Sequence, residues 1–138
     1  MPSPIVRVPL RVRYHECDAQ QIVFNAWYLA YADIALTEAA RALFGSYANL
    51  VDRGTDVVVA ESNVRYLGSG GFDDELLIDV WTQAFGTTSM VLRYDITKAG
   101  ELITQVVNRY VWVDTATHKP QAPPAEVRNA FAAHLIED

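Results

Sequence analysis

One short stretch of the chain combines an acid, a helix-capping residue and the start of a helix. The residues from Arg13 to Leu29 read RYHECDAQQIVFNAWYL, with Asp18 ahead of Asn25. Asn25 suits a helix start, because its side chain can accept a backbone N–H that has no partner within the helix. Such free N–H groups also stabilise negative charge. An acid beside them is an arrangement for acyl transfer, since the carboxylate acts where the amides polarise a carbonyl.

Each of these residues also has a purely structural interpretation. An aspartate in a loop commonly accepts a hydrogen bond from its own backbone, and Asn25 can cap the helix without taking part in chemistry. If Asp18 is catalytic, it serves either as a general base for water or as a nucleophile, and the sequence leaves both routes open. The neighbouring Cys17 is expected to be a small apolar side chain, because only His15 stands near enough in sequence to activate it.

Two further carboxylates stand in segments where an acid is unusual. Asp33 lies in an otherwise apolar helical segment, where a buried carboxylate is costly unless it is paired. Its structural interpretation is a contact with Arg41 or with a polar residue of a second chain. Glu61 falls in a β-branched run, where a side chain facing solvent is the simplest expectation, and it is a reserve candidate for a second acid. No histidine spacing suits a metal site, so no metal is expected.

The periodicity of apolar residues predicts the elements that position these candidates. Alternation predicts a strand over 6–14, and Pro9 within it indicates a sheet edge or a bulge. A helix is predicted over 26–44, apolar on every face in its first two turns and ended by Gly45. The remaining apolar segments predict four strands and a short terminal helix, over 57–67, 75–84, 88–97, 102–114 and 125–135.

This order of elements predicts an α+β fold in one domain that spans residues 1–138. The last four strands are consecutive and joined by glycine-containing turns, so they form an antiparallel sheet. A helix that is apolar on most faces needs a strongly curved sheet around it. Because one sheet leaves part of such a helix uncovered, we expect a two-fold dimer that covers the rest.

Composition argues against several kinds of partner and location. Lys and Arg number 11 against 17 Asp and Glu, and with a net charge of −6 a nucleic-acid partner is not expected. The hydrophobic content of 51% excludes a disordered chain, yet no apolar run approaches the ~20 residues of a membrane span. The first residues lack the pattern of a signal peptide and the single cysteine forms no intrachain disulfide, so a cytoplasmic protein is expected.

Several short motifs follow one another in a fixed order along the chain. The first is Y-x-x-x-D-A-x-x-I-V-F-N-x-x-Y-L, which begins at Tyr14 and is followed by Y-A-D at 31–33. The later ones are V-V-V at 57–59, Y-L at 66–67, F-D-D-E-L at 72–76 and G-T-T-S at 86–89. This ordered set resembles the 4-hydroxybenzoyl-CoA thioesterase group of hotdog-fold acyl-CoA thioesterases, from about Val8 to Val113. The resemblance implies a hotdog fold, in which a curved antiparallel five-stranded sheet wraps around one long helix.

The resemblance also implies an activity and roles for particular residues. The chain would be an acyl-CoA or acyl-carrier thioesterase, which needs no cofactor because CoA is part of the substrate. Asp18 matches the family's catalytic carboxylate, and Asn25 matches the position whose backbone N–H holds the thioester oxygen. Asp33 matches a polar position facing the acyl pocket, to which the aromatic residues Phe24 and Tyr28 are expected to contribute.

Active sites in this family lie at a dimer interface, so the resemblance implies a homodimer or homotetramer. Val58, Val59 and Glu61 of the partner chain would then line the opposite wall of the site. Few cations are available for the phosphates of CoA, and the candidates are Arg65, Lys98, Lys119 and Arg128.

The chain departs from the family pattern at two neighbouring positions. Gln21 stands where a glycine is usual, and a Gly-only backbone conformation there would be strained, so the loop is expected to differ. Ile22 replaces a histidine of one branch of the family. With no histidine in the predicted helix either, this argues against a dehydratase or hydratase of the same fold. The alternative function is a non-catalytic hotdog domain that binds acyl thioesters.

Overall fold

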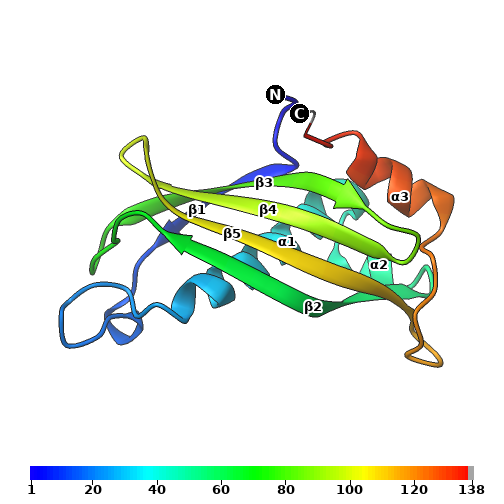
Figure 1. Cartoon of the computed structure of the whole chain (residues 1–138), viewed down its shortest axis with the longest axis horizontal. Helices are drawn as coiled ribbons and strands as arrows, with labels where there is room; N and C mark the ends of the chain where they lie inside the picture. The colour runs from blue at the N-terminus through cyan, green and yellow to red at the C-terminus, as the bar shows by residue number, and fades with distance from the viewer. Residues whose placement is uncertain (137–138) are drawn as a thin grey trace.

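A curved antiparallel sheet and one long helix form the two main layers of the molecule (Figure 1). The computed structural model describes residues 1–136. The helix α1 (Trp27–Phe44) lies behind the sheet in the view of Figure 1. The five strands of the sheet have the order β1-β3-β4-β5-β2. The other elements are β1 Val6–Arg11, β2 Thr55–Tyr66, β3 Glu75–Phe85, β4 Ser89–Lys98, β5 Glu101–Asp114, α2 Tyr47–Val51 and α3 Ala125–Ala132. The predicted hotdog architecture is confirmed.

Helix α1 packs against the sheet through one face only. Its buried residues follow the spacing of a helical stripe, and they are Tyr28, Tyr31, Ala32, Ala35, Leu36, Ala39 and Ala40. On the opposite face Leu29 and Ile34 are 38% and 40% exposed. In a single chain the sheet therefore covers one face of α1 and leaves part of the helix uncovered, as expected from the sequence. The dimer expected to cover the other face stays a prediction.

The observed elements differ from the predicted ones mainly at their ends. β1 ends at Arg11 rather than at residue 14, because the chain then turns through a 3₁₀ turn. In this turn the backbone N–H of Arg13 donates to the carboxylate of Glu16, at 2.8 Å. Helix α3 ends at Ala132, before the predicted limit of 135. Helix α2, which follows α1 after a short connection, was not predicted from the sequence.

The two edges of the sheet are built differently. β1 is one edge, as Pro9 indicated, and its Arg7 forms an ion pair with Asp79 of the neighbouring strand at 2.7 Å. β2 forms the other edge over 12 residues, and its Val58 and Val59 are 50% and 51% exposed. Proline and charge protect an edge from further pairing, whereas a long apolar edge invites it. β2 is therefore the open edge of this sheet.

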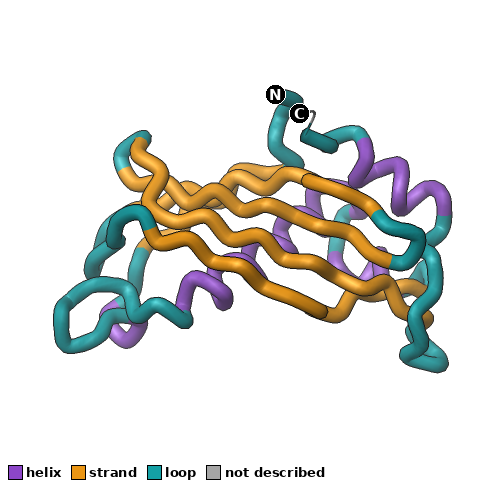
Figure 2. Tube along the Cα trace, in the orientation of Figure 1, coloured by secondary structure: helices purple, strands orange, loops and turns teal. Residues whose placement is uncertain are grey.

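Loops gather at the two ends of the sheet, as Figure 2 shows. At one end the connection between β1 and α1 lies beside the connection between β2 and β3. At the other end lie α2, α3 and the hairpin that joins β3 to β4. Within the described part of the chain, no helix is both long enough and apolar enough to cross a membrane.

Candidate active site

The connection between β1 and α1 contains a tight turn over residues 17–23, which we call the Asp18 loop. The two ends of this loop pair with each other as an antiparallel bridge. Within it the N–H of Asp18 donates to the carbonyl of Ile22 at 3.0 Å, and the N–H of Gln21 donates back to the carbonyl of Asp18 at 2.9 Å. These bonds hold the backbone of Asp18 in one position, because both its amide and its carbonyl are paired.

Gln21 has a left-handed backbone conformation, with φ of 64°. The strain predicted for a glutamine in a glycine-like conformation is therefore present, and it costs roughly 1–2 kcal/mol. Contacts on the next two residues maintain it: Ile22 forms a bridge with Gly71, and the N–H of Val23 donates to the carbonyl of Gly70 at 2.9 Å. The connection between β2 and β3 thus fixes the strained loop from one side.

Only one oxygen of the Asp18 carboxylate accepts a hydrogen bond within the loop. Its Oδ1 accepts the backbone N–H of Gln20 at 2.8 Å, so the structural interpretation of this aspartate is correct for one oxygen. Within residues 1–136, Oδ2 accepts no hydrogen bond. A half-buried carboxylate held by one oxygen and free at the other is suited to receive a proton from water or to attack a carbonyl carbon.

Asp18 borders two clefts. The larger has a volume of about 440 Å³, and its other lining residues are Tyr14, Cys17, Ala19, Gln21 and Phe72. The smaller, of about 210 Å³, extends from Asp18 to the start of α1, where Asn25 and Tyr28 line it together with Tyr66 and the backbone of 68–69. Asp18, Asn25 and Tyr28, three of the residues predicted for the site, therefore share one cleft.

The backbone N–H of Asn25, rather than its side chain, is a group at the start of α1 that is available to donate a hydrogen bond within residues 1–136. The predicted side-chain cap is wrong: Ala26 occupies the N-cap position, and no side chain caps the helix. The first turn begins early, since the N–H of Trp27 already donates to the carbonyl of Phe24 at 2.9 Å and Ala26 has helical angles. The Asn25 N–H finds no acceptor in the part of the chain that the structure describes.

The aromatic residues predicted to shape the acyl pocket behave differently from each other. Tyr28 is buried, lines the smaller cleft, and accepts the N–H of Gly70 at 3.2 Å. Its ring meets that of Tyr66 edge to face, at 5.9 Å between centroids. The hydroxyl of Tyr66 donates to the carbonyl of Asn25 at 3.1 Å. Phe24 is partly exposed and lies outside the residues that line the two clefts.

Asp33 lies further along α1, on the face that the sheet does not cover. Partial burial raises the pKa of its carboxyl above the ordinary value. The expected contact with Arg41 is wrong, because Arg41 instead pairs with Glu38 at 3.3 Å, the partner at the shorter helical spacing. Asp33 also contributes to neither cleft beside Asp18. Its expected role in the acyl pocket stays a prediction.

The candidates on β2 do not reach the clefts within one chain. Val58, Val59, Glu61 and Arg65 are exposed on the edge strand and line neither cleft. Two of the other candidate cations for CoA already have partners. Lys98 forms an ion pair with Asp74 at 2.9 Å, and Arg128 donates to the carbonyl of Gly86 at 2.9 Å.

Three residues beside the loop are not among the site residues predicted from the sequence. Tyr14 and Phe72 form an exposed edge-to-face pair at the larger cleft, with centroids 5.8 Å apart. Glu16 is buried, although acidic residues in loops normally face solvent. The Y-x-x-x-D spacing was a signal for Tyr14. Nothing local to Glu16 indicated its burial, because its partner comes from the helix.

The fold is that of the hotdog-fold hydrolases, and comparison with known proteins supports this class. The thioesterase superfamily model matches residues 20–104. The acyl-CoA thioester hydrolase YbgC of Escherichia coli is 30% identical over 132 residues, covering 95% of this chain and 98% of that protein. The 1,4-dihydroxy-2-naphthoyl-CoA hydrolase of Nostoc punctiforme is 28% identical, covering 84% of this chain and 79% of that protein. Among solved structures, the gentisyl-coenzyme A thioesterase BH1999 has a TM-score of 0.80 and 24% identity, covering 92% of this chain and 99% of that one.

The chain belongs to the thioesterase superfamily. The resemblance seen in the sequence and the expected enzyme class, a thioester hydrolase, are both confirmed. Within residues 1–136, no group of three or more His, Cys, Asp or Glu side chains is arranged to hold a metal ion.

Proposed function

We propose that this chain hydrolyses acyl-CoA or acyl-carrier thioesters at the Asp18 loop. Asp18 is the base or nucleophile, and the Asn25 N–H is the donor to the oxyanion. One observation carries the proposal: Asp18, which has a free carboxylate oxygen, and Asn25, whose N–H is unpaired within residues 1–136, line the same cleft. Catalysis of acyl transfer needs these two functions, a group that drives attack and a donor that stabilises the negative charge that follows.

Each step of the reaction has a group to carry it. In the general-base route, Asp18 takes a proton from a water molecule while the oxygen of that water attacks the thioester carbon. The carbonyl oxygen becomes an oxyanion, which accepts the Asn25 N–H. The C–S bond then breaks, and the thiolate leaves with the proton from Asp18, giving a carboxylic acid and a free thiol. In the nucleophilic route, the Asp18 carboxylate attacks the thioester carbon, the C–S bond breaks and the thiolate leaves as the thiol after taking up a proton. Water then hydrolyses the resulting anhydride, which releases the carboxylic acid and restores the Asp18 carboxylate.

The substrate is a thioester of a pantetheine arm, with CoA as the first choice. The names of the relatives support this, since the Escherichia coli protein is called an acyl-CoA thioester hydrolase and the Nostoc punctiforme protein a 1,4-dihydroxy-2-naphthoyl-CoA hydrolase. The reaction needs no cofactor, because the CoA belongs to the substrate. An acyl-carrier protein presents the same arm and is the alternative donor.

A homodimer formed through β2 completes the site. The support is the open edge itself: β2 is 12 residues long, and Val58 and Val59 are half exposed on it. The uncovered part of α1, with Leu29 and Ile34, adds further exposed apolar surface. Pairing of two β2 edges would bring the partner's Val58 and Val59, with its Glu61, toward the uncovered side of the site.

Two lysines on the open edge test the dimer. In the double variant Val58→Lys, Val59→Lys, four like charges meet across the two-fold axis, and burying them is unfavourable. Light scattering should then give half the molar mass of the wild-type protein, with an unchanged circular dichroism spectrum. Thioester hydrolysis should fall by roughly tenfold or more, since positioning is lost with the partner wall. A wild-type protein that is monomeric at micromolar concentration would remove this part of the proposal.

Asp18→Asn tests the catalytic role. The amide oxygen of asparagine still accepts the N–H of Gln20, so the loop should keep its shape while the proton acceptor is lost. Thiol release from a panel of aliphatic and aryl acyl-CoAs should fall by a factor on the order of 10²–10⁴. Asp73→Asn is the matched control, because Asp73 is exposed on the neighbouring connection and should leave activity within about twofold. If Asp18→Asn retains full activity, or if the wild-type protein binds acyl-CoA without releasing thiol, the chain is a binding domain instead.

The two routes open to Asp18 differ in where labelled oxygen goes. In a single turnover in H₂¹⁸O, a general base puts the label directly into the carboxylic acid product. A nucleophile gives an unlabelled product in the first turnover when water attacks the Asp18 carbonyl of the anhydride, and the label then enters Asp18. Mass spectrometry of the product and of the peptide containing Asp18 separates the two.

A further inference from the structure

Glu16 is a buried carboxylate close to the catalytic aspartate in the chain, and the proposed reaction does not use it. Its side chain is 4% exposed. Glu16 Oε1 accepts two hydrogen bonds, from the hydroxyl of Tyr31 at 2.8 Å and from the backbone N–H of Arg13 at 2.8 Å. The Arg13 guanidinium lies 3.7 Å from Oε2. Burying a carboxylate is costly unless such partners are present, so the site is built around this side chain.

Tyr31, the partner of Glu16, belongs to helix α1 and not to the loop. It is fully buried, one turn after Tyr28, and its ring meets that of Tyr28 edge to face at 5.7 Å between centroids. Burial and the contact with Glu16 raise the pKa of Tyr31 well above its ordinary value, so its hydroxyl stays a donor over the working pH range. The Tyr31–Glu16 hydrogen bond therefore joins the rigid helix to the segment that leads into the Asp18 loop.

The backbone of Glu16 joins the two sides of the same connection. Its N–H donates to the carbonyl of Arg13 at 3.0 Å, and its carbonyl accepts the N–H of Phe24 at 2.9 Å. Phe24 directly precedes Asn25, whose N–H is the proposed oxyanion donor. One residue thus contacts the segment before Asp18, the segment before Asn25 and the helix.

We propose that Glu16 and Tyr31 form a positioning pair that holds Asp18 and the Asn25 amide in register for attack on the thioester. The inference rests on the proposed function of Asp18 and Asn25. Neither member of the pair lines either of the two clefts beside Asp18, so each acts through geometry alone. A displacement of about 1 Å at reacting groups can lower a rate by about 100-fold, which gives the pair a measurable role in turnover.

Tyr31→Phe is the main test, because it removes one hydroxyl from a buried ring and leaves the packing in place. We expect kcat for acyl-CoA hydrolysis to fall by about 10- to 100-fold, with KM within about twofold. Tyr47→Phe is the matched control: the hydroxyl of Tyr47 also donates to a carboxylate, that of Asp56, far from the loop. This control should keep its kcat within about twofold. A Tyr31→Phe protein with wild-type kcat would overturn the proposal.

Glu16 variants separate positioning from a general loss of folding. Glu16→Gln keeps an oxygen that accepts from Tyr31 and should retain more activity than Glu16→Ala, which removes it. In an Asp18→Asn background, Tyr31→Phe should cause little further loss of kcat, because the group that it positions is already gone. Full additivity of the two losses would contradict the proposal.

Amide hydrogen exchange gives a readout that does not depend on turnover. Tyr31→Phe should speed exchange in residues 17–24, while β4 exchanges as in the wild type and in Tyr47→Phe. Unchanged exchange in residues 17–24 would overturn the proposal that Glu16 and Tyr31 position the loop. This conclusion would hold even if the chain bound thioesters without hydrolysing them. Faster exchange with an inactive wild type would instead leave the pair standing and reject the proposed function.

Discussion

The two ends of helix α1 differ in how completely their groups are paired. At the N-terminal end, Asp18 has a free carboxylate oxygen, Asn25 has a free N–H, and Gln21 is strained at φ 64°. At the C-terminal end, Gly45 takes a left-handed φ of 89°, which glycine adopts without strain, and its N–H donates to the carbonyl of Arg41 at 2.9 Å. The same helix thus begins with groups left available and ends with groups satisfied.

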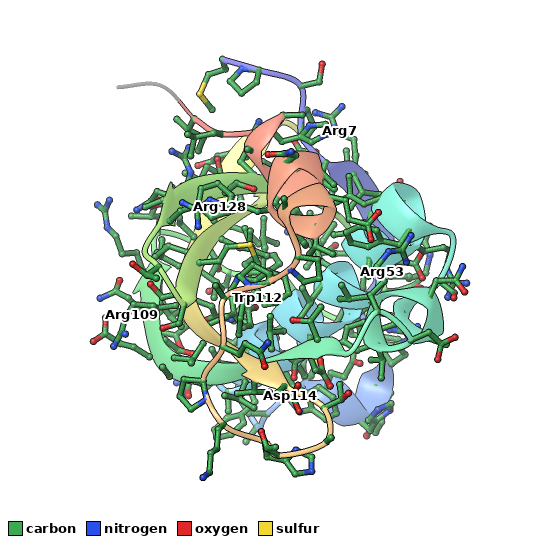
Figure 3. The ribbon with its side chains drawn as sticks, turned by 90° about the vertical axis from the view of Figure 1, so that its right-hand side faces the viewer. Arg7, Arg53, Arg109, Trp112, Asp114 and Arg128 are labelled. Carbon is green, nitrogen blue, oxygen red and sulfur yellow. The ribbon has the colours of Figure 1, made fainter. Side chains whose placement is uncertain are left out.

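Aromatic packing closes the C-terminal end. The ring of Phe131 in α3 lies 5.7 Å from that of Trp112 and 5.9 Å from that of Phe44, between centroids. Figure 3 looks onto this end and shows Trp112 inside, with Arg53 and Arg128 toward the outside. The free carboxylate oxygen of Asp18 and the strained backbone of Gln21 therefore lie where we propose catalysis, whereas the aromatic packing at the closed end supplies stability. This division of labour is expected when a functional site departs from the local rules that the rest of the fold obeys.

The largest expected effect on stability comes from the closed end. Phe131→Ala removes a ring that is 1% exposed, and the free energy of unfolding should fall by about 3–5 kcal/mol, because a cavity remains beside Trp112. Urea titration followed by fluorescence measures this loss. Hydrolysis per folded molecule should stay within about twofold, since Phe131 lies at the far end of α1 from the Asp18 loop.

Phe72→Ala is the matched change at the other end of the molecule, around the Asp18 loop and the N-terminus of α1, which we call the open end. Phe72 is 57% exposed and lines the larger cleft beside Asp18. Its loss should change the free energy of unfolding by less than about 1 kcal/mol, while kcat/KM for acyl-CoA falls. If Phe131→Ala lowered kcat as much as Phe72→Ala did, the division between a stabilising end and a functional end would not hold.

Gln21→Gly should stabilise the open end. Glycine adopts the left-handed conformation of residue 21 without strain, although it also gains freedom in the unfolded chain. We expect a net increase in the free energy of unfolding of roughly 0.5–1 kcal/mol. Gln20→Gly is the control in the same loop, because Gln20 has no left-handed backbone and the change should be neutral or destabilising. Equal changes in the free energy of unfolding for the two substitutions would mean that the left-handed conformation of Gln21 does not destabilise the fold.

Most of the fold could be predicted from apolar periodicity. The long helix and all five strands were located to within a few residues, because each carries a repeating apolar set in its sequence, although β2 leaves most of its residues exposed in a single chain. Helix α2 was not predicted because it has only five residues, too few to show a helical period. Its one clear local signal is the N-cap residue Ser46, whose hydroxyl accepts the N–H of Asn49 at 3.0 Å. The cap at Asn25 was wrong because backbone bonding in the first turn competed with the side chain.

The candidate site could be predicted only where its members are neighbours in sequence. Asp18, Asn25 and Tyr28 share a cleft because a short loop and the first turn of one helix carry them. Glu16 was missed, since its burial depends on Tyr31, which folding brings to it from the helix. The residues predicted on β2 lie on an open edge, and their role depends on a second chain that periodicity does not describe.

The smallest expected effect concerns acid stability at the open end. An ion pair with Lys98 at 2.9 Å, together with the N–H of Gly71 at 2.7 Å, lowers the pKa of Asp74 below its ordinary value. A lowered pKa in the folded state stabilises the fold above the unfolded pKa, and this contribution is lost as the pH falls through the folded pKa. Asp74→Asn should therefore reduce the free energy of unfolding at neutral pH by less than about 1 kcal/mol, and the difference from wild type should vanish in acid.

Asp114, at the closed end, also has a carboxyl with a lowered pKa, so it is the matched residue for comparing the two ends. The N–H groups of Thr117 and Ala116 lower the pKa of Asp114, and Asp114→Asn should flatten the acid side of the stability profile in the same direction. The two variants should differ in activity. Asp74 holds Gly71, which pairs with Ile22 of the Asp18 loop, so Asp74→Asn should lower kcat severalfold where Asp114→Asn leaves it unchanged. Equal kcat values in the two variants, measured at neutral pH, would mean that the connection between β2 and β3 does not help to hold the loop.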